Sequence, residues 1–380
     1  MSQAQDRIRP MQLRNSGARV MAVRFTYDRP VKWNENIPED GGTYAILTLE
    51  TECGLRGVSE ATLKPVWTGE SVRSIQAALE DTLLPRIASV NLADEHAVSM
   101  ALRAIPGNMT AKMLIDNACW DLRTQAAGMP LWKYLGGKRT VDLSWTLTRD
   151  TPTAMAAEAL EMSGRYGFRT FKMKGGQGIA VDAAAVASIR DAVSGNVRIY
   201  VDANWHYSPA EGLDFVRAIA SEGAVLAEDP WWLEANAHLQ HANETLPIPL
   251  MVDYFCEGPK DAPMFLDQGM RAFSVKPGRI GLSEAMATTR LCRERGAEVI
   301  IGMFAEMEIS TLHSLSFAST LGERYPAESS FYMMFTDSPL TQRLPIVDGA
   351  ITLPDTPGVS SQIDWQALER HAVSVCPKAA

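Results

Sequence analysis

Residues 171–174 read Phe-Lys-Met-Lys, and four later segments repeat this layout of an apolar stretch with a charged end. The repeats are Val-Asp-Ala-Asn at 201–204, Glu-Asp-Pro at 228–230, Val-Asp at 252–253 and Val-Lys at 275–276. Their charged residues follow one another at intervals of 23 to 28 residues, close to one strand, one helix and two loops. The spacing predicts charged groups at the carboxyl ends of parallel strands, where a (β/α)₈ barrel places its active site.

The barrel is predicted to begin near Val141, where short apolar runs start to alternate with helical patterns. Strands are expected at 141–147, 168–173, 197–202, 224–228, 248–253, 271–276, 297–303 and 330–335. Helices are expected between them, for example at 151–166, 180–194, 209–222 and 282–295. Eight strands that alternate with helices favour a closed parallel barrel over an open sheet.

The residues before the barrel predict a separate α+β cap domain. A strand is expected at 18–28 and a hairpin at 42–50 and 55–60, followed by helices at 70–88, 94–104 and 109–127. Strands first and helices afterwards differ from the alternation that follows. We therefore predict a cap over residues 1–139, a barrel over 140–345, and a segment at 346–380 that returns to the cap.

Composition narrows the class of protein. The 380 residues are 46% hydrophobic and 21% charged, typical of a globular protein. A net charge of −9 without a basic stripe argues against nucleic acid as a partner. The five cysteines form no Cys-x-x-Cys pair, so neither a disulfide framework nor a zinc ribbon is indicated. Without a signal peptide or a long apolar run, we expect a cytoplasmic protein with no membrane partner.

Lys172 and Lys174 lie two residues apart on a predicted strand, so their side chains project from the same face. Taken alone, such a pair fits a solvated edge strand. This strand should be interior to a barrel, where an unpaired ammonium group is costly. Two ammonium groups beside a metal would each be pushed towards the neutral form, which a general base requires.

Asp202, Glu228 and Asp253 place one carboxylate on each of three adjacent strands. Individually each also fits a turn or a helix cap. Together they cannot be buried without a cation. Oxygen ligands without His or Cys indicate Mg²⁺, or Mn²⁺, and not zinc.

Lys276 lies on the sixth predicted strand, half-way round the ring from Lys174 on the second. Taken alone it also fits a surface lysine before the turn Pro277-Gly278. With the rest, it places one lysine on each face of the α-carbon of a bound carboxylate substrate. The prediction is proton abstraction next to a carboxylate, with the metal and Lys172 offsetting the charge that develops.

Several cap motifs carry a family resemblance: Gly54 to Glu60 in the hairpin, Ala111-Lys112 with Ile115 to Leu122, Gly128 to Leu131, Leu135-Gly136-Gly137, and Pro354 to Gly358 in the tail. On these and the spaced lysines and carboxylates, the chain resembles the mandelate racemase/muconate lactonizing enzyme family of the enolase superfamily. This superfamily is the known example of a Lys or His base with magnesium holding an enediolate. The resemblance implies a small-molecule carboxylate substrate and a homo-oligomer.

Within the family, the double lysine and the lysine on the sixth strand resemble the muconate lactonizing subgroup. No histidine lies at 297–304, where the mandelate racemase subgroup would have one. The resemblance implies Lys174 and Lys276 as the acid/base pair, Lys172 as an electrostatic helper, and Asp202, Glu228 and Asp253 as Mg²⁺ ligands. Candidates for substrate contact are Glu306, Asn204, Asp337, Trp67 and Trp33, with Arg29, Lys32 and Lys64 in the cap loops at 28–41 and 60–70.

Two departures bear on the reaction. Tyr254 follows Asp253 at a position where a Glu is common in the family. The resemblance to dipeptide epimerases would require an Asp-x-Asp motif before the final Pro-Leu, and this chain has only Asp337 there. Racemisation, epimerisation or cycloisomerisation is the leading expectation. The same enolate could instead expel water from a hydroxy acid or a proline-type substrate. A non-catalytic binding protein is the rival from another class, and a metal hydrolase would usually show His ligands.

Overall fold

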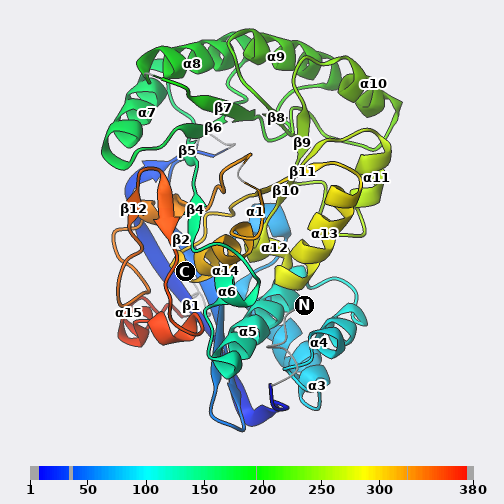
Figure 1. Cartoon of the computed structure of the whole chain (residues 1–380), viewed down its shortest axis with the longest axis vertical. Coiled ribbons are helices and arrows are strands. Elements are labelled where there is room, and N and C mark those ends of the chain that lie inside the picture. The colour runs from blue at the N-terminus through cyan, green and yellow to red at the C-terminus, as the bar shows by residue number, and fades with distance from the viewer. Residues whose placement is uncertain (1–7, 34–36, 194, 323, 375–380) are drawn as a thin grey trace, which may run out of the picture.

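The structure consists of a cap and a barrel at opposite ends of the molecule (Figure 1). It is a computed structural model that describes residues 8–33, 37–193, 195–322 and 324–374. The cap has a three-stranded sheet in the order β1-β2-β3, and the barrel has a seven-stranded sheet in the order β11-β10-β9-β8-β7-β6-β5. One apolar core packs the barrel strands against their helices and continues into the contact with the cap, a second lies inside the cap, and a small third cluster includes Tyr200, Met251 and Ile300 of the barrel strands.

The cap is a hairpin sheet covered by helices. Its strands are β1 (Leu13–Val31), β2 (Glu39–Thr51) and β3 (Arg56–Thr62), and its helices are α1 (Pro65–Thr68), α2 (Val72–Ala78), α3 (Leu84–Ile87), α4 (Glu95–Arg103), α5 (Met109–Ala127) and α6 (Leu131–Tyr134). Helix α5 packs closely on β3 at Gly57. A Cβ atom added to Gly57 would lie only 2.3 Å from the carbonyl oxygen of Ala118. A side chain at position 57 would therefore push the helix off the sheet.

The predicted helix at 70–88 is divided in the structure. A π-helical turn at Leu79–Leu83 separates α2 from α3. Pro85 lies in the first turn of α3, and its ring nitrogen has no hydrogen to donate to the preceding turn. A π-turn is a common way for a helix to absorb such a local mismatch in hydrogen bonding.

The barrel strands lie close to their predicted positions. They are β5 (Trp145–Leu147), β6 (Thr170–Lys174), β7 (Arg198–Asp202), β8 (Ala227–Glu228), β9 (Leu250–Val252), β10 (Ala272–Val275) and β11 (Glu298–Ile301), all paired in parallel. The helices are α7 (Pro152–Tyr166), α8 (Ile179–Ala192), α9 (Pro209–Ser221), α10 (Ala237–Thr245), α11 (Ala262–Asp267), α12 (Pro277–Ile280), α13 (Leu282–Glu294) and α14 (Glu308–Ala318).

The prediction of an eighth strand at 330–335 is wrong. Residues Phe331–Met334 form a 3₁₀ turn, and the sheet ends at β11. The gap between β11 and β5 is bridged by a few backbone hydrogen bonds. Glu328 N donates to Ile301 O (2.8 Å) on one side, and on the other Ala327 N donates to Asp142 O (3.0 Å) and Ser144 N to Ala327 O (2.9 Å).

The aromatic side chains of this segment pack on the cap. The ring of Phe331 lies 5.2 Å from that of Tyr27, and the ring of Phe335 lies 5.7 Å from that of Tyr44, both on the cap hairpin. Burying these rings against the cap favours a tight turn over an extended strand.

The tail after the barrel divides its contacts between both parts. Strands β12 (Ile346–Val347) and β13 (Ala350–Thr352) form a small sheet with β4 (Thr140–Asp142). The later residues, with a 3₁₀ turn at Ser360–Gln362 and α15 (Trp365–Arg370), reach the cap: Val359 N donates to Asp121 of α5, and Arg24 N of β1 donates to His371 O. The cap and barrel limits predicted above stay a prediction.

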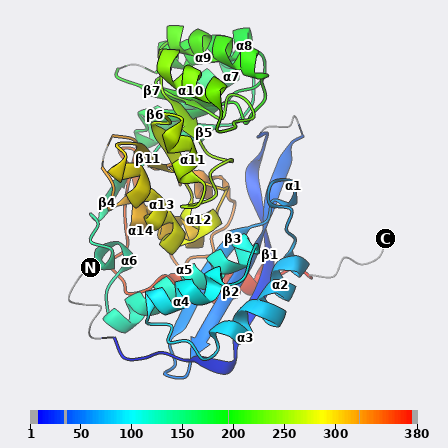
Figure 2. The ribbon, with the colours of Figure 1, turned by 90° about the vertical axis from the view of Figure 1, so that its right-hand side faces the viewer.

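The long β1–β2 hairpin extends from the cap alongside the barrel, as the side view shows (Figure 2). Tyr44 donates its hydroxyl to Ala305 O at 2.9 Å. Glu60 on β3 accepts from Met307 N (2.7 Å) and Ser310 N (3.0 Å), so a cap carboxylate binds the amino end of barrel helix α14. None of the helices in the described ranges is long and apolar enough to cross a membrane.

A buried histidine makes stability depend on pH. His313 in α14 is fully buried, its Nδ1 donates to Ile309 O at 3.0 Å, and burial lowers the pKa of its imidazole to about 4. Below pH 6.5 the unfolded chain binds a proton that the folded chain refuses, so stability is complete above pH 6.5 and falls towards pH 4. Between pH 7 and pH 4 the wild type should lose up to about 3 kcal/mol more unfolding free energy than His313→Gln.

Urea unfolding at several pH values measures this difference. His241→Gln, at an exposed position of α10, is the matched control and should follow the wild type. Parallel curves for the wild type and His313→Gln would contradict the assignment.

Candidate active site

The three predicted lysines converge at the carboxyl ends of the barrel strands. Lys172 and Lys174 end β6, and Lys276 follows β10 directly. Their exposed fractions are 2%, 8% and 8%, so all three ammonium groups are held inside the protein. Buried lysines need anionic partners, and the neighbouring strands supply them.

The three predicted carboxylates end the adjacent strands. Asp202 is the last residue of β7 and pairs in register with Lys174 on one side and with Glu228 of β8 on the other. Asp253 follows β9, whose Met251 is in register with Glu228. All three side chains are buried. The parallel register thus places three acids side by side at one edge of the sheet.

Each lysine pairs with one or more of these acids. Lys174 Nζ donates to Asp202 Oδ2 at 2.6 Å and to Asn204 Oδ1 at 3.2 Å. Lys276 Nζ donates to Asp253 Oδ2. Lys172 Nζ lies 2.6 Å from Glu228 Oε2 and 3.2 Å from Asp202 Oδ2.

These pairs set the protonation of the acids. Burial opposes charge on Asp202 and Asp253, yet the lysines outweigh it: Lys174 and Lys172 lower the pKa of Asp202, and Lys276 and Lys172 lower that of Asp253. Burial and the charge of Asp202 raise the pKa of Glu228 well above its usual value. Glu228 is therefore the acid with the least support from its surroundings.

Lys172 departs from the expectation of a lysine pushed towards the neutral form. Burial lowers its pKa, but the charges of Glu228, Glu328 and Asp202 together raise it well above its usual value. The expectation assumed a metal beside the lysines; among the protein groups alone, acids surround Lys172. It is a fixed positive charge in this arrangement.

The donor set fits a divalent cation. Neither carboxylate oxygen of Glu228 has a hydrogen-bond partner in the described chain, and Lys172 Nζ forms an ion pair with Oε2 at 2.6 Å. In the same ranges no three His, Cys, Asp or Glu side chains already form a cation cage, since the ammonium groups lie between the acids. Three adjacent hard oxygen donors, one of them unsatisfied, are a set that Mg²⁺ or Mn²⁺ could use.

Two side chains that the sequence did not single out complete the site. Glu328 is fully buried, accepts from Lys172 Nζ at 3.1 and 3.2 Å, and accepts from the hydroxyl of Tyr200 at 2.7 Å. It follows Ile301, the end of β11, by about one strand-helix unit, so the spacing of strand ends could have indicated it. Tyr200 lies inside β7 and gave no signal beyond that of a core aromatic residue.

Asp229, directly after Glu228, is a third residue of the site that the sequence did not single out. Its carboxylate accepts from the backbone N–H groups of Asp253 (3.1 Å) and Tyr254 (2.9 Å). Burial, with the charges of Asp253 and Asp202, raises the pKa of Asp229 to about 8. Asp229 thus holds the turn after β9 where this chain has Tyr254. Asn204, Trp205 and Asp229 all have positive φ, a strained conformation typical of functional loops.

A cavity joins the lysines to the cap. It is lined by Trp33, Lys64, Trp67, Lys172, Lys174, Asn204, Asp253, Lys276, Met303, Phe304 and Ala305. The ammonium groups of Lys64 and Lys174 lie 5.5 and 5.8 Å from the ring centre of Trp33, and Lys276 lies 6.0 Å from that of Phe304. Aromatic rings from the cap and from the loop after β11 therefore cover the charged floor.

The other predicted substrate contacts do not line this cavity. Asp337 pairs with His371 at 2.9 Å, and Arg29 pairs with Glu158. Lys32 offers its carbonyl oxygen to Arg149 N. Glu306 is buried beside the cavity wall, where its Oε2 accepts from Phe304 N and its Oε1 has no partner in the described chain. The predicted loop at 28–41 includes residues 34–36, which lie outside the described ranges.

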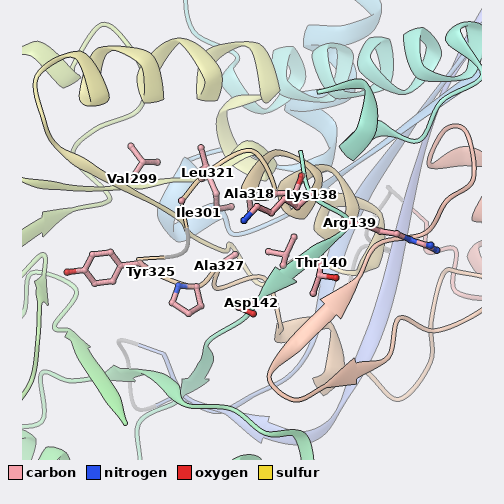
Figure 3. A pocket seen from close by; sticks show the side chains of 14 residues that line it. Lys138, Arg139, Thr140, Asp142, Val299, Ile301, Ala318, Leu321, Tyr325 and Ala327 are labelled. Atoms are coloured by element: carbon pink, nitrogen blue, oxygen red, sulfur yellow. The ribbon is translucent and has the colours of Figure 1, made fainter. Parts of the chain in front are cut away.

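A larger cavity of about 480 Å³ lies at the seam between β11 and β4 (Figure 3). Val299 and Ile301 form one wall and residues 138–142 the other. Its only acid is Asp142, and Arg139 is already bound to Leu353 O. The paired lysines and acids are elsewhere, so the chemistry favours the smaller cavity under the cap.

Known proteins are similar to this chain over both the cap and the barrel. Residues 17–136 match the model of the mandelate racemase/muconate lactonizing enzyme N-terminal domain, and residues 154–367 match that of the enolase C-terminal domain-like family. A muconate cycloisomerase of Acinetobacter lwoffii is 27% identical over 86% of this chain and 88% of its own. A hydrophobic dipeptide epimerase of Enterococcus faecalis is 31% identical over 69% of this chain and 75% of its own.

Solved structures of such enzymes have a fold similar to that of this chain. A muconate lactonizing enzyme of Mycobacterium smegmatis in complex with muconolactone has a TM-score of 0.90 at 25% identity, covering 96% of this chain and 100% of its own. The Enterococcus faecalis epimerase in complex with Mg and the dipeptide L-Leu-L-Tyr has a TM-score of 0.83 at 25% identity, covering 92% and 99%.

Proposed function

The chain belongs to the mandelate racemase/muconate lactonizing enzyme family of the enolase superfamily, and on that premise we propose that it racemises or epimerises a small carboxylate substrate. The family membership makes it an isomerase-type enzyme whose reaction passes through an enolate. One observation supports the finer assignment: Lys174 and Lys276 enter a single cavity from the second and sixth strands of the sheet.

The lysines would act as a proton donor and acceptor pair. The α-proton of a carboxylate is barely acidic, because its removal creates a dianion. Lys174 or Lys276, once neutral, would take the proton from one face of the α-carbon, and the other would return one to the opposite face. A substrate seated between two lysines can therefore leave with inverted configuration.

Charge stabilisation is the second requirement. Asp202, Glu228 and Asp253 would hold Mg²⁺ or Mn²⁺, which would supply positive charge beside the substrate carboxylate. Lys172 adds a further positive charge, and Glu328 keeps it in place through two hydrogen bonds. Trp33, Trp67 and Phe304 would exclude water above the reacting carbon. These rings also favour a substrate with an apolar group beyond its carboxylate.

Hydrogen exchange tests the proposed function. The purified protein, Mg²⁺ and a panel of N-acyl amino acids, dipeptides and proline derivatives are incubated in D₂O. Deuterium should enter the α-position of one substrate class while its optical rotation decays. If a substrate is consumed without deuterium or racemisation in the recovered pool, elimination replaces isomerisation. No exchange across the whole panel would count against the proposal.

Glu328→Gln should weaken divalent-cation binding by roughly 10- to 100-fold, the usual cost of losing a partner of the inner ligands. With Glu328 neutral, Lys172 keeps only Glu228 and Asp202 as anionic partners and competes with the cation for them. Calorimetric titration with Mg²⁺ measures the change. Tyr200→Phe, which removes only the hydroxyl that donates to Glu328, should show a smaller loss. Equal affinity in wild type and Glu328→Gln would refute this role.

A further inference from the structure

Arg123 is a buried cation with unused hydrogen-bond donors far from the lysines. It lies on α5, is 1% exposed, and donates from Nε to Leu92 O at 3.1 Å. Its two terminal nitrogens have no partner among the described residues. Its guanidinium carbon lies 5.0 Å from the ring centre of Trp120. Leaving such buried donors unsatisfied is costly, so a partner is expected.

Arg123 is one of the residues that line a groove of about 820 Å³ between α4, α5, α6 and α13. The groove shares no lining residue with the cavity that holds the lysines. Trp120, Tyr134, Leu135 and Met286 provide apolar walls. The size is in the range of small-molecule sites, and apolar walls with a few polar groups are their usual composition.

Further charges surround the opening. Lys133 and Arg290 are exposed, and neither enters an ion pair within the described ranges. Arg103 is already paired with Glu284 at 2.7 Å. Asp94 and Glu95 are the acids of the groove, and burial raises the pKa of Glu95. The groove therefore has more unpaired cationic side chains than acidic side chains that could pair with them.

We propose that this groove is a second ligand site, in which Arg123 binds the oxyanion of a small molecule, a carboxylate or a phosphoryl group. The two terminal nitrogens form a planar fork that matches two oxygens of one such group. Lys133 and Arg290 would hold the same charge from the rim. The apolar walls would contact the remainder of the ligand. Because α4 and α5 belong to the cap and α13 to the barrel, the ligand would bridge both parts.

Calorimetric titration of the full-length protein with inorganic phosphate and with benzoate tests the site. One saturable site is expected for at least one of them. Arg123→Lys keeps the charge but loses the fork and should weaken binding about 10-fold or more. Arg290→Ala and Lys133→Ala, at exposed positions that do not threaten folding, should each weaken it about 2- to 5-fold. Glu95→Gln removes the competing acid and should tighten it.

The Lys174→Ala, Lys276→Ala double variant separates this groove from the active site, since benzoate could also reach the catalytic lysines. Binding in the groove should persist in that variant. Phosphate without benzoate would assign a phosphoryl ligand, and benzoate without phosphate an organic acid. The proposal is overturned if neither anion binds saturably, if binding is lost in the double variant, or if Arg123→Lys and Arg290→Ala both bind as the wild type does.

Discussion

Replacing Lys174 or Lys276 with alanine should lower the racemisation rate by roughly 10²- to 10⁴-fold, the usual contribution of a positioned acid or base. Each variant keeps the other lysine, so deuterium should still enter the enantiomer whose α-proton faces the remaining amine. Lys174→Ala and Lys276→Ala should therefore exchange opposite enantiomers. The measurement is NMR of each pure enantiomer in D₂O.

The controls separate chemistry from loss of structure. Lys276→Arg preserves the charge that pairs with Asp253, but an arginine cannot lose its proton at neutral pH. It should be as inactive as Lys276→Ala and more stable. Lys260→Ala removes an exposed lysine in the loop between β9 and α11 and should leave the rate unchanged. If both active-site variants exchange the same enantiomer, the two lysines do not face opposite sides of the substrate.

Glu228→Gln should abolish the response of the protein to divalent cations. Glu228 is the central acid of the three, and burial and the charge of Asp202 already make its carboxylate costly in the absence of a cation. The neutral amide relieves that repulsion, so the metal-free variant should unfold at the wild-type temperature or above it. Mg²⁺ should raise the melting temperature of the wild type, because it binds only the folded chain, and should not raise that of the variant.

The matched control is Glu244→Gln, at an exposed position of α10, which should keep the full Mg²⁺-dependent rise. Activity in Glu228→Gln should fall with the loss of the cation response. If Mg²⁺ raises the melting temperature of Glu228→Gln as much as that of the wild type, the ion is bound elsewhere. That result would refute the assignment of the metal ligands without testing the roles of the two lysines.

Much of the site followed from spacing alone. Parallel strands of similar length end at one edge of a sheet, so charged residues at regular intervals had to meet there. Lys172, Lys174, Asp202, Glu228, Asp253 and Lys276 do meet. The same pattern failed at 330–335, because a short apolar run cannot distinguish a strand from a turn whose rings pack on the cap.

The spacing of residues along the sequence could not predict contacts between distant segments. Glu328 reaches Lys172 only because residues 327–328 bridge the open side of the barrel, and Asp229 reaches Tyr254 through a turn between neighbouring strands. Trp33 and Lys64 meet over the site because the cap hairpin is long enough to arrive there. Asp337, a plausible contact by position, instead pairs with His371.

The order and period of the residues by themselves determined a barrel of alternating strands and helices with lysines and acids at its strand ends, because strand and helix periods are local properties of the chain. Only the tertiary structure decided which acid pairs with which lysine, how the barrel is closed without an eighth strand, and which cap side chains cover the site. Those outcomes depend on burial and on charge pairs between segments far apart in the chain, and no local pattern encodes them.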